Sequence, residues 1–352
     1  MIRNHLPRLL MLIIIILLSA RSAAGDDTVY LRGGSTLQGS VTQLSDAGVQ
    51  IDGDGWTETI GWDRIRRITG KYAQEAEKYA VIADTLWRAR IRLERGDPYM
   101  ASPLFESLYD RYRGTTSVTA LVICEGVLRC RLFLDENPGN ALEPYLQTLR
   151  LIDLGIEQTA YNDLDPVIDP QTGLVPRLPP FRLYHDNKTI KVDLTRLPRG
   201  DDPVVDALAE LYLSVFSGSD TPYPRPLPDI SFPEATSVEI IHSILSASSS
   251  SNSVRRQARK ELETMINSDP PAWLISWCRF AMGISLLQES SEEDRLRGVL
   301  ELLRLPVTLN DAQPDLAAAA GHLAADELES QGYSSYAERI RRDLAEQGES
   351  DR

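Results

Sequence analysis

The chain has 352 residues, of which 42% are hydrophobic and 25% are charged, and its formal net charge is -14 at pH 7. This composition is typical of a folded globular protein, so long disordered tails and collagen-like repeats are excluded. A multi-span membrane protein is excluded as well, because each span needs a run of about 20 apolar residues. The acidic balance also argues against nucleic-acid binding, which requires Lys and Arg to neutralise phosphates.

The N-terminus has the layout of a secretory signal peptide. A basic region with Arg3 and Arg8 precedes an unbroken apolar run from Leu9 to Leu18, and small residues follow it. The run is about half as long as a membrane span requires. We therefore expect residues 1–25 to be a signal peptide cleaved near Ala24, which directs the protein to the periplasm or cell envelope. The alternative is an uncleaved anchor that tethers the same protein to the membrane.

Cysteine usage indicates that the fold does not depend on disulfides. The chain has three cysteines, Cys124, Cys130 and Cys278. Cys124 and Cys130 are six positions apart in a helical pattern, or about 240° apart around the helix axis, so they cannot bond to each other. Buried thiols are expected, and the sequence leaves open a bridge from either of them to Cys278.

Residues 26–70 are predicted to form a small β domain of about five strands. Apolar and polar residues alternate between Thr28 and Ile68, as in half-buried strands. Turn residues such as Gly33-Gly34 and Asp52–Gly55 separate the runs. A sheet of this size must curl into a barrel or have one face covered. The predicted buried residues are Val29, Leu31, Leu37, Val41, Val49, Ile51, Ile60 and Trp62.

The run from Val29 to Val41, closed by Ile65-Arg66-Arg67-Ile68, resembles the small SH3-like or Sm-like barrels found at the N-termini of many exported bacterial proteins. In that resemblance Gly34 serves the first turn, and Gly39 permits the bend of the second strand. Sm-like proteins bind RNA, but the acidic chain and its signal peptide argue against carrying that activity over.

From Gly70 onwards the apolar period changes to 3.6, and residues 71–155 are predicted to form helical hairpins. Two amphipathic helices occupy Ala80 to Arg113, and Gly96, Asp97 and Pro98 form the turn between them. These 34 residues have the length of one tetratricopeptide repeat.

The same hairpin resembles that repeat in its residue types. Ala89, Gly96, Ala101 and Phe105 stand where the repeat has a small residue, the turn glycine, a second small residue and an aromatic, whereas Leu108 departs from the pattern. The resemblance implies an α-solenoid in which neighbouring hairpins bury one another's apolar faces. Three further pairs are predicted: Val118–Leu134 with Asn140–Ile152, Trp273–Leu287 with Leu296–Leu305 behind a capping box of Ser290 and Glu293, and Leu316–Leu328 with Tyr333–Leu344.

The centre of the chain, residues 156–235, is predicted to be a proline-rich, ordered loop region containing one helix, 203–216, that begins at the Asp202 cap. Gly173–Tyr184 is too apolar for a free linker, so we expect it to pack against helices. Ser246–Ser253 has the composition of a flexible connection. Helical hairpins are expected again over residues 236–346, followed by a tail over 347–352.

No residue pattern specifies a reaction, so no catalytic, cofactor-binding or metal-binding residue is predicted. His5 lies in the signal peptide, and His185, His242 and His322 lack Cys or acidic neighbours at metal-ligand spacing. The sequence has no phosphate-binding loop, dinucleotide-binding motif or nucleophile elbow. Asp52, Asp54 and Glu58 carry closely spaced carboxylates that calcium would accept, but the EF-hand spacing is absent and a hairpin turn explains them.

Two further clusters have structural explanations that we prefer to functional ones. The helical stripe of Trp273, Trp277, Phe280 and Ile284 is expected to be core rather than a ligand platform. The basic cluster of Arg255, Arg256, Arg259 and Lys260 is expected to be a solvated, salt-bridged helix face.

Taken together, the sequence predicts a mainly α protein, a tetratricopeptide-like α-solenoid with a small N-terminal SH3-like barrel. The predicted function is that of an exported, noncatalytic scaffold that binds a peptide or partner protein, with no cofactor and no nucleic acid. The alternative is an envelope hydrolase or carbohydrate-binding protein with a site near residues 173–184. A structural homo-oligomer is a third reading, and neither the oligomeric state nor the partner's identity follows from the sequence.

Overall fold

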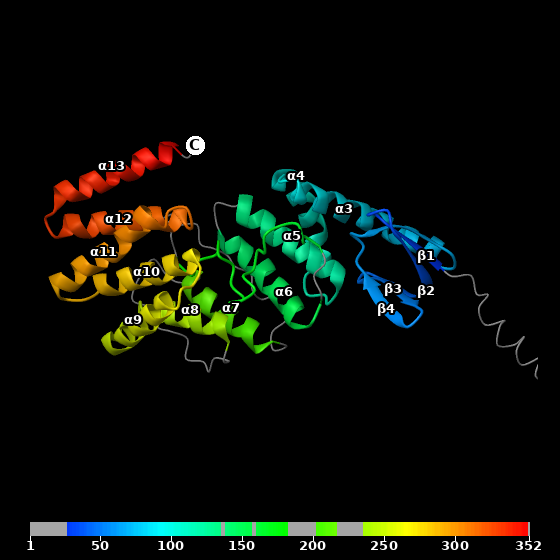
Figure 1. The fold of residues 1–352 in the computed structure, drawn as a ribbon, viewed down its shortest axis with the longest axis horizontal. Helices are drawn as coiled ribbons and strands as arrows, with labels where there is room; N and C mark the ends of the chain where they lie inside the picture. The colour runs from blue at the N-terminus through cyan, green and yellow to red at the C-terminus, as the bar shows by residue number, and fades with distance from the viewer. Residues whose placement is uncertain (1–26, 135–137, 157–159, 182–201, 217–234, 351–352) are drawn as a thin grey trace, which may run out of the picture. The chain divides into compact units, whose positions relative to one another are not determined.

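The computed structural model describes residues 27–134, 138–156, 160–181, 202–216 and 235–350. The protein is mainly helical, with a five-stranded antiparallel sheet at the N-terminal end of the described chain (Figure 1). It divides into two compact units. The first comprises Met1–Cys130 with Leu151–Leu164, and the second comprises Arg131–Arg150 with Asp165–Arg352. The predicted signal peptide lies outside the described residues.

The sheet confirms the prediction of about five strands. Its strand order is β4-β3-β2-β1-β5, so β4 and β5 are the two edges. Of the predicted core residues all are buried except Leu37, which is half-buried. The strands are β1 (Asp27–Leu31), β2 (Thr36–Ser45), β3 (Gly48–Gly53), β4 (Trp56–Ile60) and β5 (Ile65–Thr69).

Glycine stands in the β1–β2 turn and at a close contact within β2. Gly34 adopts a φ of +88°, a left-handed conformation that favours glycine in the β1–β2 turn. Gly39 is buried within β2, and a Cβ atom there would collide with the backbone carbonyl oxygen of Asp52 in β3. A residue with a side chain at position 39 would therefore push these two strands apart.

Helices cover the sheet through the segment that follows β4. The Trp62 ring stacks on Tyr79 with the ring centroids 4.5 Å apart, and its indole N–H donates to the carbonyl of Ser45 at 2.9 Å. The Thr119 hydroxyl accepts from the Trp62 backbone N–H at 3.2 Å and donates to the carbonyl of Ala47 at 2.9 Å. The small sheet therefore gains its stability from helix residues packed against it.

The first helical hairpin forms as predicted. A short helix α2 (Ala73–Ala76) and the 3-10 turn η2 (Glu77–Tyr79) lead into α3 (Ala80–Glu94), which packs against α4 (Pro98–Tyr112). Gly96 takes a φ of +75° in the turn, and the Asp97 side chain accepts a hydrogen bond from the Met100 N–H at 3.1 Å.

The next two helices occupy the predicted residues apart from one start, and their pairing as a hairpin stays a prediction. Helix α5 spans Val118–Leu134, as expected. Helix α6 spans Leu142–Asp153 rather than beginning at Asn140, because the residues before it form the 3-10 turn η3 (Pro138–Ala141). Tighter 3-10 turns are common at helix starts.

The second unit contains the remaining helices. The predicted helix at 203–216 is confirmed as α7, where the Asp202 carboxylate accepts hydrogen bonds from the backbone N–H groups of Val204 and Val205. The helices are α7 (Pro203–Phe216), α8 (Thr236–Ser246), α9 (Asn252–Asn267), α10 (Ala272–Leu287), α11 (Glu292–Thr308), α12 (Pro314–Ser330) and α13 (Ser334–Ser350).

Two local predictions are wrong. The expected flexible connection over Ser246–Ser253 is a short turn between α8 and α9, and Ser248 and Ser249 within it are buried. The cap of α11 is Ser291, not Ser290: its hydroxyl accepts from the Asp294 N–H, while the Glu293 carboxylate pairs with Arg297 at 2.9 Å. In the first case, burial of serine side chains orders the turn. In the second, the helix cap lies one residue further along the chain than predicted.

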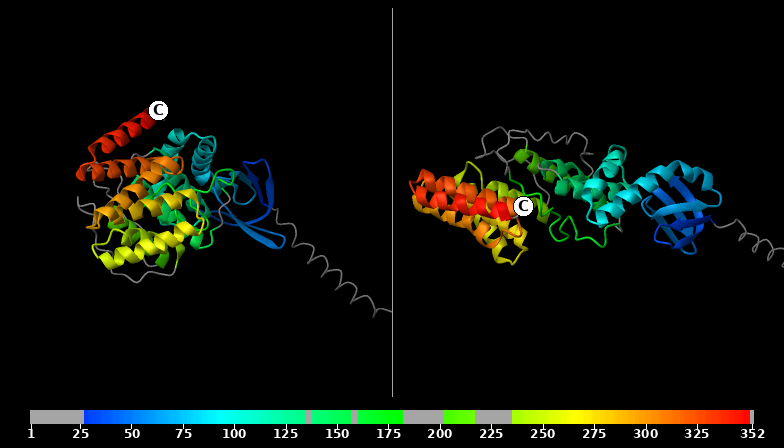
Figure 2. Two further views of the ribbon diagram at one scale, coloured as in Figure 1. Left: turned by 60° about the vertical axis from the view of Figure 1, so that its left-hand side comes forward. Right: turned by 90° about the horizontal axis from the view of Figure 1, so that it is seen from above.

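Consecutive helices pack on one another through the second unit. From α7 to α13 each helix contacts the next, and α10 also contacts α8 and α12 (Figures 1 and 2). The last helix is different, because Ala337 is the one fully buried residue among its described side chains. Its remaining side chains are exposed or half-exposed and mostly polar.

Two glycines set the close approach between α10 and α11. A Cβ on Gly298 would lie 2.9 Å from the carbonyl oxygen of Gly283 and 3.0 Å from Leu286 Cβ, so the helices meet backbone to backbone here. Gly321 in α12 differs, since its nearest neighbours are the methyl groups of Leu344, a side chain that can move.

We predict that Gly298→Ala lowers the free energy of unfolding by about 1–3 kcal/mol, because the added methyl group forces α10 and α11 apart. Gly321→Ala serves as the matched control and should change it by less than about 1 kcal/mol, since alanine favours helix and Leu344 can adjust. Urea unfolding of the two variants and the wild type tests this. Equal effects of the two substitutions would contradict the proposed close contact.

Candidate functional site

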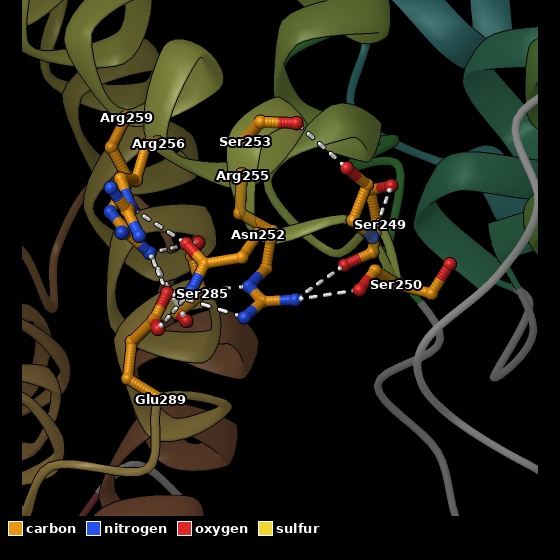
Figure 3. A network of polar contacts seen from close by, with 10 residues as sticks. Ser249, Ser250, Asn252, Ser253, Arg255, Arg256, Arg259, Ser285 and Glu289 are labelled. Carbon is orange, nitrogen blue, oxygen red and sulfur yellow. Dashed lines mark hydrogen bonds and ion pairs between the residues drawn. The ribbon is translucent and has the colours of Figure 1, made fainter.

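A buried network of polar groups joins three consecutive elements of the second unit (Figure 3). Arg255 in α9 donates through Nη1 to the carbonyl oxygens of Ser249 and Ser250, at 3.0 and 3.2 Å, in the α8–α9 turn. The same guanidinium pairs with Glu289, just beyond α10, at 3.3 Å. This one side chain therefore connects α9 to the α8–α9 turn and to the end of α10.

Arg259 completes the network one helical turn further along α9. Its Nη1 atom lies 2.9 Å from Glu289 Oε1 and donates to the Ser285 hydroxyl at 2.9 Å. On the other carboxylate oxygen, Asn252 Nδ2 donates to Glu289 Oε2 at 3.2 Å. Glu289 thus receives charge-assisted hydrogen bonds from two arginines while its side chain is only 10% exposed.

The electrostatics of Glu289 follow from these contacts. Burial on its own would raise the pKa of the Glu289 carboxyl, but hydrogen bonds from Arg259 and Arg255 and their positive charges outweigh burial. The pKa of Glu289 is therefore lowered below its ordinary value. The carboxylate form stabilises the folded state, and this contribution is lost as the pH falls through the folded-state pKa.

This network confirms the ion pairing predicted for the basic cluster of α9 but corrects the prediction that the whole cluster is a solvated helix face. Arg255 is buried and Arg259 is half-buried, because they share a helical stripe with the buried residues Ala258 and Leu262. Arg256 and Lys260 are exposed on the other side of the helix. The spacing of two arginines along an apolar stripe was the signal that could have revealed an internal role.

A second buried polar group lies in the first unit. Asp63 is almost fully buried and its Oδ2 atom lies 2.6 Å from Arg90 Nη1, while burial raises the pKa of the Asp63 carboxyl.

Tyr161 holds a φ of +62°, which is unusual for a bulky residue, and its hydroxyl donates to the carbonyl of Val122 at 2.9 Å. The guanidinium of Arg129 lies over its ring. These contacts hold the strained backbone in place.

The other residues considered at the sequence level have structural contacts. The Asp52 carboxylate accepts from the Thr57 hydroxyl at 2.8 Å, and Glu58 pairs with Arg64 at 3.3 Å, in keeping with a hairpin. His242 is half-buried, and burial lowers its pKa. His322 lies in α12, and His185 lies outside the described residues. Among the residues that the structure describes, no three His, Cys, Asp or Glu side chains are grouped to hold a metal ion.

The three cysteines are buried free thiols. Burial raises the pKa of the Cys130 thiol to about 12 and that of Cys278 to about 12, so neither is ionised near neutral pH. The structure thus agrees with the expectation of buried thiols and assigns them no reactive role.

The aromatic stripe of α10 is core, as expected. Trp277, Phe280 and Ile284 are buried, and Trp273 packs edge-on against Trp277 with ring centroids 4.8 Å apart. Phe181 packs against Phe280 at 4.6 Å. The stripe therefore holds the central loop against α10.

The apolar loop at 173–184 packs against helices, which is confirmed up to Phe181, the last described residue of the segment. Leu174, Val175 and Leu178 are fully buried. Its carbonyl groups accept from α6, α7 and the α12 cap: Tyr145 donates to Gly173, Tyr212 to Leu178 and Gln313 to Pro176, at 2.7, 3.1 and 2.7 Å. Packing accounts for the apolarity that had suggested a binding site here.

One exposed apolar surface of the second unit lies on α11. Leu300 and Val307 are seven positions apart, on one side of the helix, and are 61% and 77% exposed. Arg297 and Arg304 lie exposed along the same face. Large apolar side chains at this exposure, rimmed by charge, are typical of interaction surfaces.

Comparison with protein-family models, with curated proteins and with solved structures finds no match for this chain. The contacts and exposed faces described above are therefore the basis for assigning a function.

We predict that Glu289→Gln lowers the free energy of unfolding by about 3 kcal/mol at pH 7, because two partly buried arginines lose their counter-ion. The wild type should lose stability as the pH falls below the ordinary pKa of Glu and through the lowered pKa of Glu289, and E289Q should lose less, since the titrating group is gone. Glu263→Gln, an exposed position on α9, is the control and should behave as wild type. Urea unfolding at several pH values tests the pair, and parallel pH profiles would contradict the role of Glu289.

Proposed function

We propose that the protein is a noncatalytic, exported scaffold that binds a peptide or partner protein through a tetratricopeptide-like helical surface. The single observation that carries this proposal is the exposed apolar face of α11, formed by Leu300 and Val307 on one side of a helix that packs between α10 and α12. A wide surface of stacked helices is a preformed platform for an extended or helical partner.

The repeat identity of the helices is part of this proposal, and two hairpins support it. Gly96 and Gly332 both adopt a positive φ in the turn, at +75° and +86°. Ala325 precedes Gly332 by the same number of residues as Ala89 precedes Gly96, and both alanines are fully buried. The α3–α4 and α12–α13 hairpins therefore place equivalent residues in equivalent environments, as copies of one structural repeat would.

The SH3-like fold of the N-terminal sheet and the export of the protein are further parts of the proposal. The five antiparallel strands, the close approach of Gly39 to β3 and the order of the strands support the likeness to SH3-like barrels. Export rests on the sequence of residues 1–25. Within the residues that the structure describes, none of the helices combines the length and the apolarity needed to cross a bilayer.

We predict that a photo-crosslinking residue at position 300 or 307 captures a discrete partner from cell-envelope extract, whereas one at position 81 does not. Val81 is a suitable control because it is as exposed as Val307 but lies on α3. A partner that binds the α11 face should become covalently linked to the crosslinking residue and can then be identified.

Affinity for the captured and purified partner then tests the assignment. Leu300→Asp combined with Val307→Asp should weaken binding by at least about tenfold, since burying one such side chain contributes about 1.5–3 kcal/mol. Val81→Asp combined with Met100→Asp should leave binding unchanged. Equal crosslinking at the three positions, or equal affinity of the two double variants, would refute the proposed surface.

A further inference from the structure

The outer face of strands β1 and β5 carries a cluster of arginine and aromatic side chains that no part of the proposed function uses. Arg66 and Arg67 are exposed, and the other members are partly exposed. We refer to this cluster as the arginine face, and it comprises Tyr30, Arg32, Arg66, Arg67 and Trp87.

A break in strand register creates the arginine face. Ile65 and Ile68 are both buried although they are three positions apart, which a regular strand with alternating sides does not allow. The pairing of β1 with β5 shifts between Tyr30 and Leu31, so that Arg66 is an extra residue opposite β1. A bulge of this kind points both arginines outward and is a device that re-aims side chains.

Aromatic rings support two of the guanidinium groups. Arg67 lies over the ring of Tyr30, its cross-strand partner, at 4.3 Å, and Arg32 lies over the ring of Trp87 at 4.6 Å. A guanidinium stacked on a ring keeps its in-plane N–H groups available for a carboxylate, to which it can donate two parallel hydrogen bonds. Arg32 Nε already donates to the carbonyl of Ile65 at 3.1 Å and its Nη2 atom lies near Asp84, so Arg67 is the stacked guanidinium that is preorganised for a planar anionic group.

The charges of the arginine face are not balanced locally. Arg32 lies 3.6 Å from the carboxylate of Asp84, but among the described residues no carboxylate lies within ion-pair distance of Arg66 or Arg67. Burial lowers the pKa of Arg32; the charge of Asp84 opposes this shift, and the nearby charge of Arg66 adds to it. Like charges thus lie close together on the face.

The excess of positive charge on the arginine face contrasts with the charge of the rest of the chain. Residues 27–96 contain ten Lys and Arg and ten Asp and Glu, whereas residues 97–352 contain 24 Lys and Arg and 40 Asp and Glu. Two unpaired arginines persist on the sheet of a protein that otherwise has an excess of carboxylates. An anionic partner would supply the missing counter-charge.

We propose that the arginine face binds a short acidic segment of a partner protein, whose carboxylates pair with Arg66 and Arg67. Tyr, Trp and Arg are the residue types that contribute most to protein–protein binding energy, and all three meet on this face. The site lies on the sheet and is separate from the α11 face, so it extends the proposed scaffold by a second contact of defined chemistry.

The size of the face favours a short segment over an extended polyanion. Asp84 and Glu58 pair with Arg32 and Arg64 at its border, and Glu75 and Glu77 lie exposed just after β5. A nucleic acid or an anionic bilayer extends beyond the face and would meet these carboxylates, which would repel it. A few Asp or Glu residues can occupy the face without this penalty.

The test uses the full chain and a fluorescein-labelled octaglutamate peptide as the probe. We expect salt-dependent binding that Arg66→Glu combined with Arg67→Glu weakens at least tenfold. Arg66→Gln combined with Arg67→Gln, which removes charge without adding repulsion, should weaken it in the same direction. The matched control is Arg339→Glu combined with Arg342→Glu on α13, two exposed arginines whose replacement causes the same change in net charge.

Three results would overturn the proposal. One is that the wild type does not bind octaglutamate at millimolar concentration in low salt. Another is that the α13 control loses as much affinity as the sheet variants. The third is that phosphatidylglycerol vesicles or duplex DNA bind the wild type more tightly than the peptide does. The α11 variants should retain octaglutamate binding, so a failure of the arginine face and a failure of the proposed scaffold surface are distinguishable.

Discussion

The structure depends on the fact that a single amphipathic helix cannot bury its own apolar face. Each helix from α7 to α13 meets this need by packing on its neighbour in the chain, and small residues allow the closest contacts, as at Gly283 and Gly298. The N-terminal sheet faces the same constraint, and Trp62 and Thr119 join it to helices that cover it. Burial of apolar area between neighbours is thus the main source of stability in both units.

Polar groups then determine where the packed elements begin, end and turn. Arg255 holds the α8–α9 turn by its carbonyl groups, and Glu289 neutralises Arg255 and Arg259 where α10 ends. A buried ion pair adds little net stability compared with apolar packing, but removal of one partner is costly. The network therefore restricts the relative positions of α9 and α10 more than it stabilises them.

The sequence predicts most of the elements because their signals are local. Gly96, Asp97 and Pro98 mark the turn of the first hairpin within three residues, and the Asp202 cap does the same for α7. The internal role of Arg255 could not be read in this way, since its partner Glu289 is distant in sequence. It was nevertheless signalled by the position of arginines on the apolar stripe of α9.

The arginine face likewise could not be predicted from local residue types alone. Its arginines are visible in the sequence, but only the pairing of β1 with β5 reveals the extra residue that turns both of them outward. Close contacts such as that of Gly298 with Gly283 also depend on which helices meet. Local residue types thus predict the elements, and their partners in space decide the surfaces.

The last helix differs from the others in the side chains that it presents to solvent. Helix α13 uses Ala337 and its half-buried neighbours against α12 and carries mostly polar side chains elsewhere. A further layer would need a second apolar stripe on α13, which its sequence does not supply. Among its described residues α13 therefore offers few apolar side chains to solvent, Tyr336 being the most exposed of them, and any contact made with this face would depend mainly on polar groups.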